Sequence, residues 1–351
     1  MRGQTRDGPL PGRVAVTPLA DGISQPPADR FDTALLDLDG VVYVGPHAVD
    51  GVAKTLAEVR RRGMRTAFVT NNASRTPETV AAHLRELGVE AKPEDVVTSA
   101  QAAATLVLGR VGAGAAVLVV GGEGLHAALI ERGLRPVTSA DYAEAVVQGF
   151  APDVDWQALA EGTFAVRRGL PWIAANMDST VPTPRGIAPG NGALVGVIAR
   201  TTGVTPVAVA GKPELALHEE SVRRTGAQNP IVVGDRLDTD IEGANRAGVP
   251  SLLVLTGVAT PADVVRAESI HRPTYVAADL HAGLLEAHPP VTRDARGWTC
   301  GSATVTPDGS LDGTGIDALR AACVAAWSGE VDVEAVVAAL DSPSFSKSIM
   351  H

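Results

Sequence analysis

Two apolar segments of the chain each end in a pair of aspartates. Asp37 and Asp39 close the first segment, and Asp235 and Asp240 follow the second. Asp37 and Asp39 are two residues apart, so in an extended backbone their side chains project to the same face. Crowded carboxylates repel each other, and one of them holds its proton unless a cation compensates the charge. The spacing therefore predicts a cation site.

Hydrogen-bond donors follow two further apolar segments. Thr70, Asn71 and Asn72 end one of them, and Lys212 stands between a glycine and a proline after the other. Each of these residues could by itself be a loop cap or a solvated surface residue. Only four of the 30 Lys and Arg residues are lysines. A lysine at this position in so arginine-rich a chain indicates a need for a compact ammonium group.

Phosphoryl transfer is the chemistry that this set of residues suits. Carboxylates around a hydrated cation favour Mg²⁺ over Zn²⁺, because the sequence has no cluster of Cys and His. Mg²⁺ together with Lys212 would attract a phosphate dianion, and Thr70 and Asn71 could donate hydrogen bonds to its oxygens. One ionised carboxylate could attack phosphorus as a nucleophile. The second could protonate the leaving alkoxide and later activate water.

The sequence predicts an α/β fold that brings these segments together. Apolar, strand-like segments alternate with helical patterns, which is typical of a parallel sheet with right-handed crossovers. In such sheets ligands bind at the carboxyl ends of the strands, so the polar residues there should converge. The expected strands lie in segments 33–40, 65–72, 206–213, 230–235, 250–255 and 274–277. The expected helices lie in segments 50–63, 76–88, 213–225 and 241–247.

A second α/β domain is expected to be inserted into the first. Residues 31–97 and 203–288 would form a Rossmann-like core, and residues 98–202 would form the inserted domain, in which no strand ends in paired acids. The strands expected in the insertion are 115–120, 145–149 and 172–176.

The two ends of the chain differ from the middle. Residues 1–30 are interpreted as a flexible N-terminal extension, because they are rich in Pro, Gly, Arg and Asp and have no apolar stretch. Residues 289–351 are interpreted as a small C-terminal α/β extension. Its expected elements are a strand at 298–305, a turn at 307–310 and helices at 316–327 and 331–340.

The composition disfavours several classes of protein. A formal net charge of −10 argues against a nucleic-acid or anionic-membrane binder, and no apolar run approaches the ~18–20 residues of a membrane span. Cys300 and Cys323 fit two free thiols, although a disulfide is also compatible. The dispersed histidines, among them His218 and His288, are expected at the surface. The expected location is the cytoplasm, and a homo-oligomer is compatible with the sequence.

The polar segments resemble the four motifs of the haloacid dehalogenase superfamily. The matching segments are DLDGVVY at 37–43, TNNASR at 70–75, GKP at 211–213 and GDRLDTDI at 234–241. Their sequences most resemble those of the subgroup with an α/β cap between the second and third motifs. This subgroup includes NagD-like, phosphoglycolate and 4-nitrophenyl phosphatases. Segment 178–194 resembles the end of that cap, with Asn191 where a small residue is usual. The resemblance covers residues 31–288.

The resemblance implies a role for each motif residue. Asp37 would be the nucleophile and Asp39 the general acid and base. The Mg²⁺ ligands would be Asp37, the backbone carbonyl of Asp39 and Asp235, with Asp240 in support. The phosphate would be held by Thr70, Asn71, Asn72 and Lys212. Because true dehalogenases lack the second acid, Asp39 favours a phosphatase.

The substrate rests on resemblance alone. In this subgroup the cap reads the leaving group, and Asn176, Asp178 and Arg185 are candidates for that role, although capping and loop hydrogen bonds would equally explain them. The full architecture is similar to that of actinobacterial glycerol 3-phosphate phosphatases, which implies glycerol 3-phosphate first, with phosphoglycolate and sugar or nucleoside monophosphates as alternatives. Two other functions stay open, namely a phosphomutase or phosphotransferase and a non-catalytic protein that responds to phosphate.

Overall fold

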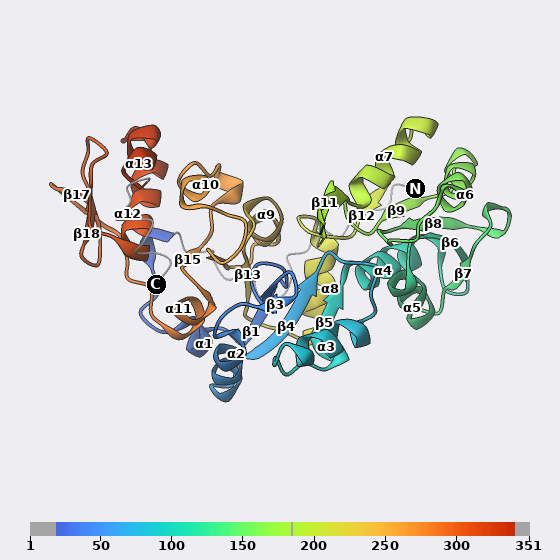
Figure 1. The fold of residues 1–351 in the computed structure, drawn as a ribbon, viewed down its shortest axis with the longest axis horizontal. Coiled ribbons are helices and arrows are strands. Elements are labelled where there is room, and N and C mark those ends of the chain that lie inside the picture. The colour runs from blue at the N-terminus through green and yellow to red at the C-terminus, as the bar shows by residue number, and fades with distance from the viewer. Residues whose placement is uncertain (1–18, 184, 341–351) are drawn as a thin grey trace, which may run out of the picture. The chain divides into compact units, whose positions relative to one another are not determined.

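A six-stranded sheet carries three of the four predicted catalytic segments, those of Asp37, Thr70 and Asp235. The computed structural model describes residues 19–183 and 185–340 (Figure 1). The strand order is β15-β14-β13-β1-β4-β5, and the pairings of β4 with β5, β13 with β14 and β14 with β15 are parallel. The strands are β1 (Thr33–Leu36), β4 (Arg65–Thr70), β5 (Val96–Thr98), β13 (Pro230–Gly234), β14 (Ser251–Val254) and β15 (Tyr275–Ala277). The predicted α/β fold is therefore confirmed.

Helices precede or follow the strands of this sheet along the chain. They are α2 (Val52–Arg61), α3 (Pro77–Glu86), α8 (Leu215–Thr225), α9 (Glu242–Ala247), α10 (Pro261–Val265) and α11 (Leu280–Leu285). Thr76 caps α3 by accepting a hydrogen bond from the backbone N–H of Thr79, as its position before Pro77 predicts. A short hairpin of β2 (Tyr43–Val44) and β3 (His47–Ala48) follows β1. Strand β5, only three residues long, was not predicted.

A five-stranded sheet forms between α3 and α8 in the chain. Its order is β12-β9-β8-β6-β7, and all its pairings are parallel. The strands are β6 (Ala116–Val120), β7 (Arg135–Val137), β8 (Ala145–Gln148), β9 (Trp172–Ala174) and β12 (Ala208–Val209). The accompanying helices are α4 (Ser99–Val111), α5 (Glu123–Glu131), α6 (Trp156–Arg167) and α7 (Asn191–Thr202). The fully buried Trp172 lies in the apolar core of this sheet.

Strand β12 pairs with β9 and not with the six-stranded sheet, where the strand before Lys212 was expected. Of the strand expected at 206–213, only Ala208 and Val209 form strand pairings, and Val207 before them is 51% exposed. An edge strand this short has too little apolar pattern to indicate which sheet it joins. A second unpredicted element is the hairpin of β10 (Thr180–Thr183) and β11 (Gly186–Pro189), whose mostly exposed residues give no apolar alternation.

The C-terminal extension combines a four-stranded antiparallel sheet with two helices. Its elements are β16 (Thr292–Asp294), β17 (Gly297–Cys300), β18 (Ala303–Val305), β19 (Leu311–Asp312), α12 (Gly315–Trp327) and α13 (Val333–Leu340). The single strand expected at 298–305 was wrong, because Gly301 takes a φ of +55° and turns the chain into a hairpin between β17 and β18. The two cysteines of this region are free and buried.

The chain before β1 also contains ordered elements. A 3-10 turn (Leu19–Asp21) and α1 (Pro27–Arg30) fall within the expected flexible extension, and Ile23 forms a β-bridge with His288. Residues 1–18 and 341–351, which the sequence assigned to the two terminal extensions, lie outside the described part of the chain.

The chain divides into two compact units. Among the described residues, the first unit comprises 19–34, 59–65 and 226–340, and the second comprises 35–58 and 66–225 without residue 184. Over these residues, no helix is long and apolar enough to cross a membrane.

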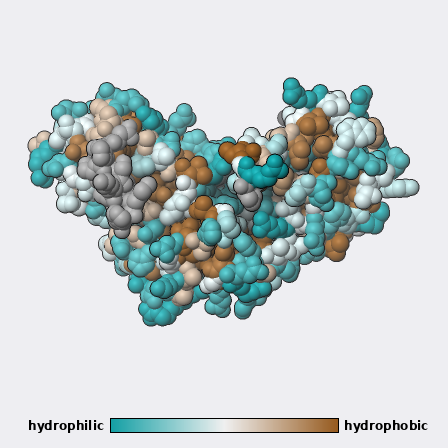
Figure 2. Space-filling view, viewed as in Figure 1, coloured by the Kyte–Doolittle hydropathy of each residue, from teal (hydrophilic) through white to brown (hydrophobic). Residues whose placement is uncertain are grey.

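Apolar side chains also reach the surface. Figure 2 shows apolar areas interspersed with polar ones on the viewed face. The most exposed large apolar residues are Trp156 and Ile187, each at 81%. Scattered apolar residues of this kind are normal on soluble domains and do not by themselves indicate a site.

The expectation that the histidines lie at the surface was wrong for His218 and His288, which are 2% and 1% exposed. The Nε2 of His288 lies 2.9 Å from the carbonyl oxygen of Gly283, and its Nδ1 lies 2.9 Å from a guanidinium nitrogen of Arg320. A neutral ring that donates from Nε2 and accepts at Nδ1 satisfies both neighbours. Burial, followed by the charge of Arg320, lowers the pKa of His288 to about 4.

Replacement of His288 by Gln should make the stability of the protein less sensitive to acid. In the unfolded chain His288 takes up a proton near pH 6.5, but the folded state keeps it neutral down to about pH 4. The unfolded state therefore binds more protons in this window, and stability falls as the pH drops through it. Melting temperatures at pH 7 and pH 5 should differ less for the variant than for the wild type. Equal differences would contradict the assignment.

Candidate active site

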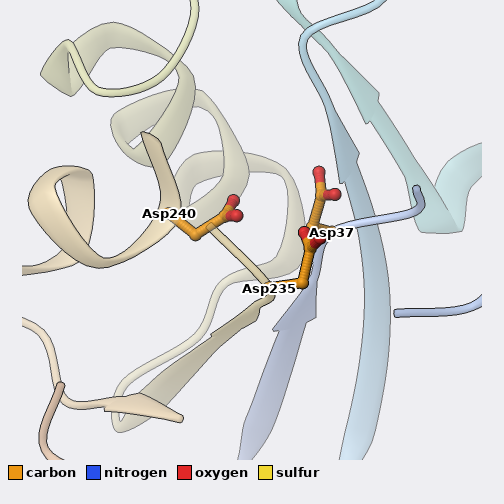
Figure 3. A group of neighbouring side chains, drawn as sticks. All are labelled: Asp37, Asp235 and Asp240. Atoms are coloured by element: carbon orange, nitrogen blue, oxygen red, sulfur yellow. The ribbon is translucent and has the colours of Figure 1, made fainter. Parts of the chain in front are cut away.

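Three carboxylates from distant parts of the sequence form a cluster. Asp37 follows β1, Asp235 follows β13, and Asp240 lies in a single π-helical turn (Leu237–Ile241) before α9 (Figure 3). One carboxylate oxygen of each lies within 4.8 Å of those of the other two. The strand order places β1 beside β13, so the carboxyl ends of two adjacent strands supply Asp37 and Asp235.

Backbone N–H groups hold two of these carboxylates. Asp235 accepts a hydrogen bond from the N–H of Val258 at 2.7 Å, and Asp240 accepts one from the N–H of Arg236 at 3.2 Å. Both aspartates are 1% exposed, whereas Asp37 is half-buried. Buried carboxylates oriented in this way have fixed positions for a bound cation.

The cluster has the donor chemistry of a site for a hard divalent cation. Its ligand atoms are carboxylate oxygens only, and in the described part of the chain it is the one group of three or more His, Cys, Asp or Glu residues so close together. Oxygen ligands of this kind suit Mg²⁺, which retains several waters, and they do not suit Zn²⁺. The residues present therefore fit the expected metal.

Asp39 lies in the turn after β1 and is exposed, unlike Asp235 and Asp240. The surrounding protein nevertheless disfavours its charged form, so desolvation raises the pKa of the Asp39 carboxyl. The nearby charges of Arg75, Lys212 and His83 oppose this effect. A carboxyl with a raised pKa keeps its proton to a higher pH than an ordinary aspartate, as a general acid requires.

Lys212 contacts the expected nucleophile directly. Its ammonium group forms an ion pair with Oδ1 of Asp37 and also donates to the carbonyl oxygen of Val69 at 3.3 Å. The lysine side chain is only 4% exposed. A buried ammonium without a carboxylate would be costly, so the pair fixes both side chains. The structure thus brings Lys212 and Asp37 together although β12 does not belong to the six-stranded sheet.

Asn71 fixes the backbone of Lys212. Its Oδ1 accepts from the N–H of Lys212 at 2.8 Å, and its Nδ2 donates to the carbonyl oxygen of Lys212 at 3.1 Å. The same Nδ2 donates to the carboxylate of Asp178 at 3.2 Å. A Cβ at Gly211 would lie 2.6 Å from the Oδ1 of Asn71, which explains why glycine precedes the lysine. The Asn71 amide, expected to face phosphate, instead positions Lys212 in this structure.

The other two polar residues after β4 shape their own loop. The hydroxyl of Thr70 accepts a hydrogen bond from the N–H of Asn72 at 3.1 Å. The Oδ1 of Asn72 accepts from the N–H and from the hydroxyl of Ser74, both at 2.8 Å. A Thr hydroxyl that accepts one bond can still donate its hydrogen to another oxygen. Contact of Thr70 and Asn72 with phosphate stays a prediction.

Two of the three candidate specificity residues join this hydrogen-bond network. Asn176 donates from Nδ2 to the carbonyl oxygen of Asn71 at 2.7 Å, and its Oδ1 accepts from the N–H of Asp178 at 3.2 Å. Arg185 is instead exposed in the turn between β10 and β11, where its N–H donates to the hydroxyl of Thr183. Asn176 and Asp178 therefore hold Asn71. This agrees with the alternative given for them above, that they form loop hydrogen bonds instead of reading the leaving group.

Two members of the network were not predicted from the sequence. Asn191, which is 1% exposed, donates from Nδ2 to the carbonyl oxygen of Asn176 at 2.7 Å. The hydroxyl of Ser99 donates to the carbonyl oxygen of Asn71. The only sequence signal for Asn191 is an amide where the resembling subgroup has a small residue. Ser99 opens α4 and gives no such signal.

Comparison with known proteins identifies the family. Residues 34–135 match the model of the haloacid dehalogenase-like hydrolases, and residues 209–282 match a second model of HAD-like hydrolases. The D-glycerol 3-phosphate phosphatase of Mycobacterium tuberculosis is 46% identical over 310 residues, which cover 86% of this chain and 87% of the relative. An acid sugar phosphatase of Staphylococcus aureus is 38% identical over 259 residues, 73% of this chain and 98% of the relative.

Solved structures show the same relationship. The crystal structure of the glycerol phosphate phosphatase of M. tuberculosis with magnesium has a TM-score of 0.80 and 44% identity, and the match covers 90% of this chain and 98% of that one. A thermostable NPPase variant from Geobacillus stearothermophilus has a TM-score of 0.65 and 37% identity, with 72% and 97% covered.

The chain belongs to the haloacid dehalogenase-like hydrolases. Within that family it is an enzyme of the phosphoric monoester hydrolase class. The family resemblance found in the sequence is thereby confirmed.

The contact between Asn71 and Asp178 can be tested by exchanging the two side chains. Asn71→Asp alone removes the amide donor and sets two carboxylates against each other, so kcat/KM should fall about 10- to 100-fold as Lys212 loses its fixed position. The double variant Asn71→Asp/Asp178→Asn restores one donor and one acceptor and should recover part of that loss. Steady-state kinetics of the wild type, both single variants and the double variant measure the coupling. A double variant no better than the additive expectation would contradict it.

Proposed function

We propose that this chain is a Mg²⁺-dependent phosphatase that hydrolyses a small phosphate monoester through an aspartyl-phosphate on Asp37. The observation that carries the proposal is the ion pair of Lys212 with Asp37 inside a cluster of carboxylates that suits Mg²⁺. This arrangement keeps a nucleophilic carboxylate ionised and provides positive charge for an incoming phosphate.

Glycerol 3-phosphate is the proposed substrate. Its support is the D-glycerol 3-phosphate phosphatase of M. tuberculosis, which matches across 86% of this chain. The acid sugar phosphatases match a smaller part of the chain at lower identity. Phosphoglycolate and sugar or nucleoside monophosphates are therefore second choices.

The reaction proceeds in two displacements at phosphorus. In the first, a carboxylate oxygen of Asp37 forms a bond to phosphorus as the bond to the leaving oxygen breaks, and Asp39 gives its proton to the departing alkoxide. In the second, Asp39 takes a proton from water, the water oxygen bonds to phosphorus, and the bond from phosphorus to Asp37 breaks. The products are the free alcohol and inorganic phosphate, and Asp37 is regenerated.

The remaining site residues stabilise the negative charge of the bound phosphate. Lys212 is positioned by the side chain of Asn71 to neutralise one of its oxygens. Thr70, Asn72 and the backbone N–H of Asn71 are proposed as hydrogen-bond donors to the phosphate. Asp37, the Asp39 carbonyl and Asp235 would hold Mg²⁺, with Asp240 in support. When bound, Mg²⁺ supplies positive charge that attracts and orients the phosphate.

The proposed domain organisation follows from these roles. Residues 31–97 and 203–288 form the catalytic core, apart from β12, which pairs with β9 in the five-stranded sheet. Residues 98–202 form a cap that reads the leaving group. Residues 1–30 and 289–351 are extensions of the core. A cytoplasmic location, a homo-oligomer and the absence of nucleic-acid binding stay predictions.

A phosphate-release assay tests the proposal. Purified protein with Mg²⁺ should release inorganic phosphate from glycerol 3-phosphate with a higher kcat/KM than from phosphoglycolate or a sugar phosphate, and a chelator should abolish the release. A phosphotransferase would instead pass the phosphoryl group to an added alcohol, with little free phosphate. Absence of phosphate release from every ester tested would overturn the proposal.

Substitution of the two catalytic acids should separate their roles. Asp37→Asn should abolish turnover, because the amide oxygen cannot replace the carboxylate as nucleophile. Asp39→Asn should slow turnover by ~10²–10⁴-fold, the usual contribution of proton transfer. Asp238→Asn is the matched control, because Asp238 stands between Asp235 and Asp240 in the sequence but forms an ion pair with Arg236. Substantial turnover by Asp37→Asn would refute the assignment of the nucleophile.

A further inference from the structure

The C-terminal extension shares one apolar core with the segment that follows β14. Buried residues of that core come from α12, such as Leu319 and Ala322, from α10, such as Val264, and from Ala259 before α10. Figure 1 shows α10 close to α12 and α13. The extension thus packs on α10, which belongs to the same compact unit as Asp235.

The segment before α10 holds Asp235. The N–H of Val258 donates to the carboxylate of Asp235 at 2.7 Å, and the N–H of Ala259 donates to its carbonyl oxygen at 3.1 Å. The backbone of Gly257 lies so close that a Cβ there would be 1.9 Å from the same carboxylate. Residues 257–259 therefore fix both the backbone and the side chain of Asp235.

This segment is joined rigidly to α10. The hydroxyl of Thr260 accepts from the N–H of Asp263 at 3.3 Å, and the carboxylate of Asp263 accepts from the N–H of Thr260 at 2.9 Å. This capping box connects residue 259 to the first turn of the helix. With only five residues, α10 has too few hydrogen bonds to be stable without tertiary contacts.

The extension supplies those contacts at the other end of α10. The indole Nε1 of Trp327, in the last turn of α12, donates to the carbonyl oxygens of Val264 and Val265, both at 3.2 Å. These carbonyls close α10, where a helix leaves its last C=O groups without intrahelical donors. The carbonyl of Val264 also accepts from the N–H of Ala267 at 3.2 Å, and the indole is an additional donor that ties this end of α10 to the extension. The guanidinium of Arg272 stacks over the same indole at 5.2 Å.

The relatives show that the extension is additional to the core and cap. The acid sugar phosphatase matches this chain over 259 residues, which are 98% of its own length. That length suffices for the segment 31–288 but leaves nothing for a counterpart of the extension. A role for the extension must therefore be particular to chains such as this one.

We infer that the C-terminal extension positions the carboxylate of Asp235 for cation binding, with Trp327 as the positioning residue that acts through α10 and residues 257–259. The inference rests on the Mg²⁺ site of the proposed function. Loss of the indole N–H would loosen the end of α10, and the N–H of Val258 would then hold Asp235 less firmly. The folded core would survive, because the ring would still fill its place.

Calorimetric titration of the full-length protein with MgCl₂, without substrate, tests the inference. Trp327→Phe removes the donor and keeps an aromatic ring, and it should raise the Kd for Mg²⁺ about 3- to 10-fold, less than the ~10- to 100-fold expected when a direct partner of a ligand is lost. Thr260→Val breaks the capping box at the opposite end of α10 and should raise the Kd likewise. Glu334→Gln is the control. The exposed ion pair of Glu334 with Arg266 also joins the extension to the end of α10, but it involves neither Trp327 nor the capping box at Thr260.

The outcomes separate the inference from the proposed function. Wild-type affinity for Mg²⁺ in both Trp327→Phe and Thr260→Val, even with lower melting temperatures, would overturn the inference alone and leave the extension a purely stabilising role. Mg²⁺ binding by the wild type without hydrolysis of any phosphate ester would overturn the proposed function, while weaker binding by the variants would still support the inference. A wild type that binds no Mg²⁺ would overturn both.

Discussion

The ion pair between Lys212 and Asp37 is the interaction on which the rest of the site depends. Asp37 stands close to two buried carboxylates, and positive charge is needed to offset the mutual repulsion of the three. A nucleophile must be ionised, so the ammonium group and the proposed cation together make the chemistry accessible at neutral pH. The same positive charge attracts the phosphate dianion. Positioning of one lysine therefore serves both the resting state and the reaction.

The hydrogen-bond network around Lys212 explains how residues far apart in the sequence serve that requirement. The amide of Asn71 binds both backbone groups of Lys212, and Asn176 and Asp178 bind Asn71 in turn. A network in which every member is bonded is rigid, and its effect exceeds that of the single contacts. The side chains of Asn71, Asn176 and Asp178, which were expected to contact the substrate, thus act as positioning residues for Lys212. Within the other compact unit, residues 257–259 hold Asp235 through backbone N–H groups.

The sequence predicts the α/β fold and the convergence of the acids, because both depend on local pattern and on a general rule of parallel sheets. Asp37 and Asp235 end apolar strands, and adjacent strands bring such ends together. The sheet to which β12 belongs could not be predicted, since two edge residues carry no pattern. Gly301 is a local turn signal within the expected strand that the strand prediction passed over. The burial of His288, in contrast, depends on a tertiary contact with Arg320 that no local signal reports. The partners of the Asn71 amide, Lys212 and Asp178, were not predicted, because an asparagine can bind phosphate or backbone equally well.

The central claim is that Asp37 carries the phosphoryl group during turnover. Acid quenching within the first turnover, followed by proteolysis and mass spectrometry, measures this directly, because an acyl phosphate survives brief exposure to acid. We expect a peptide that contains Asp37 with the added mass of one phosphoryl group, seen with Mg²⁺ and substrate and absent when Mg²⁺ is chelated. Release of inorganic phosphate with no phosphorylated peptide, or with the group on another residue, would contradict it.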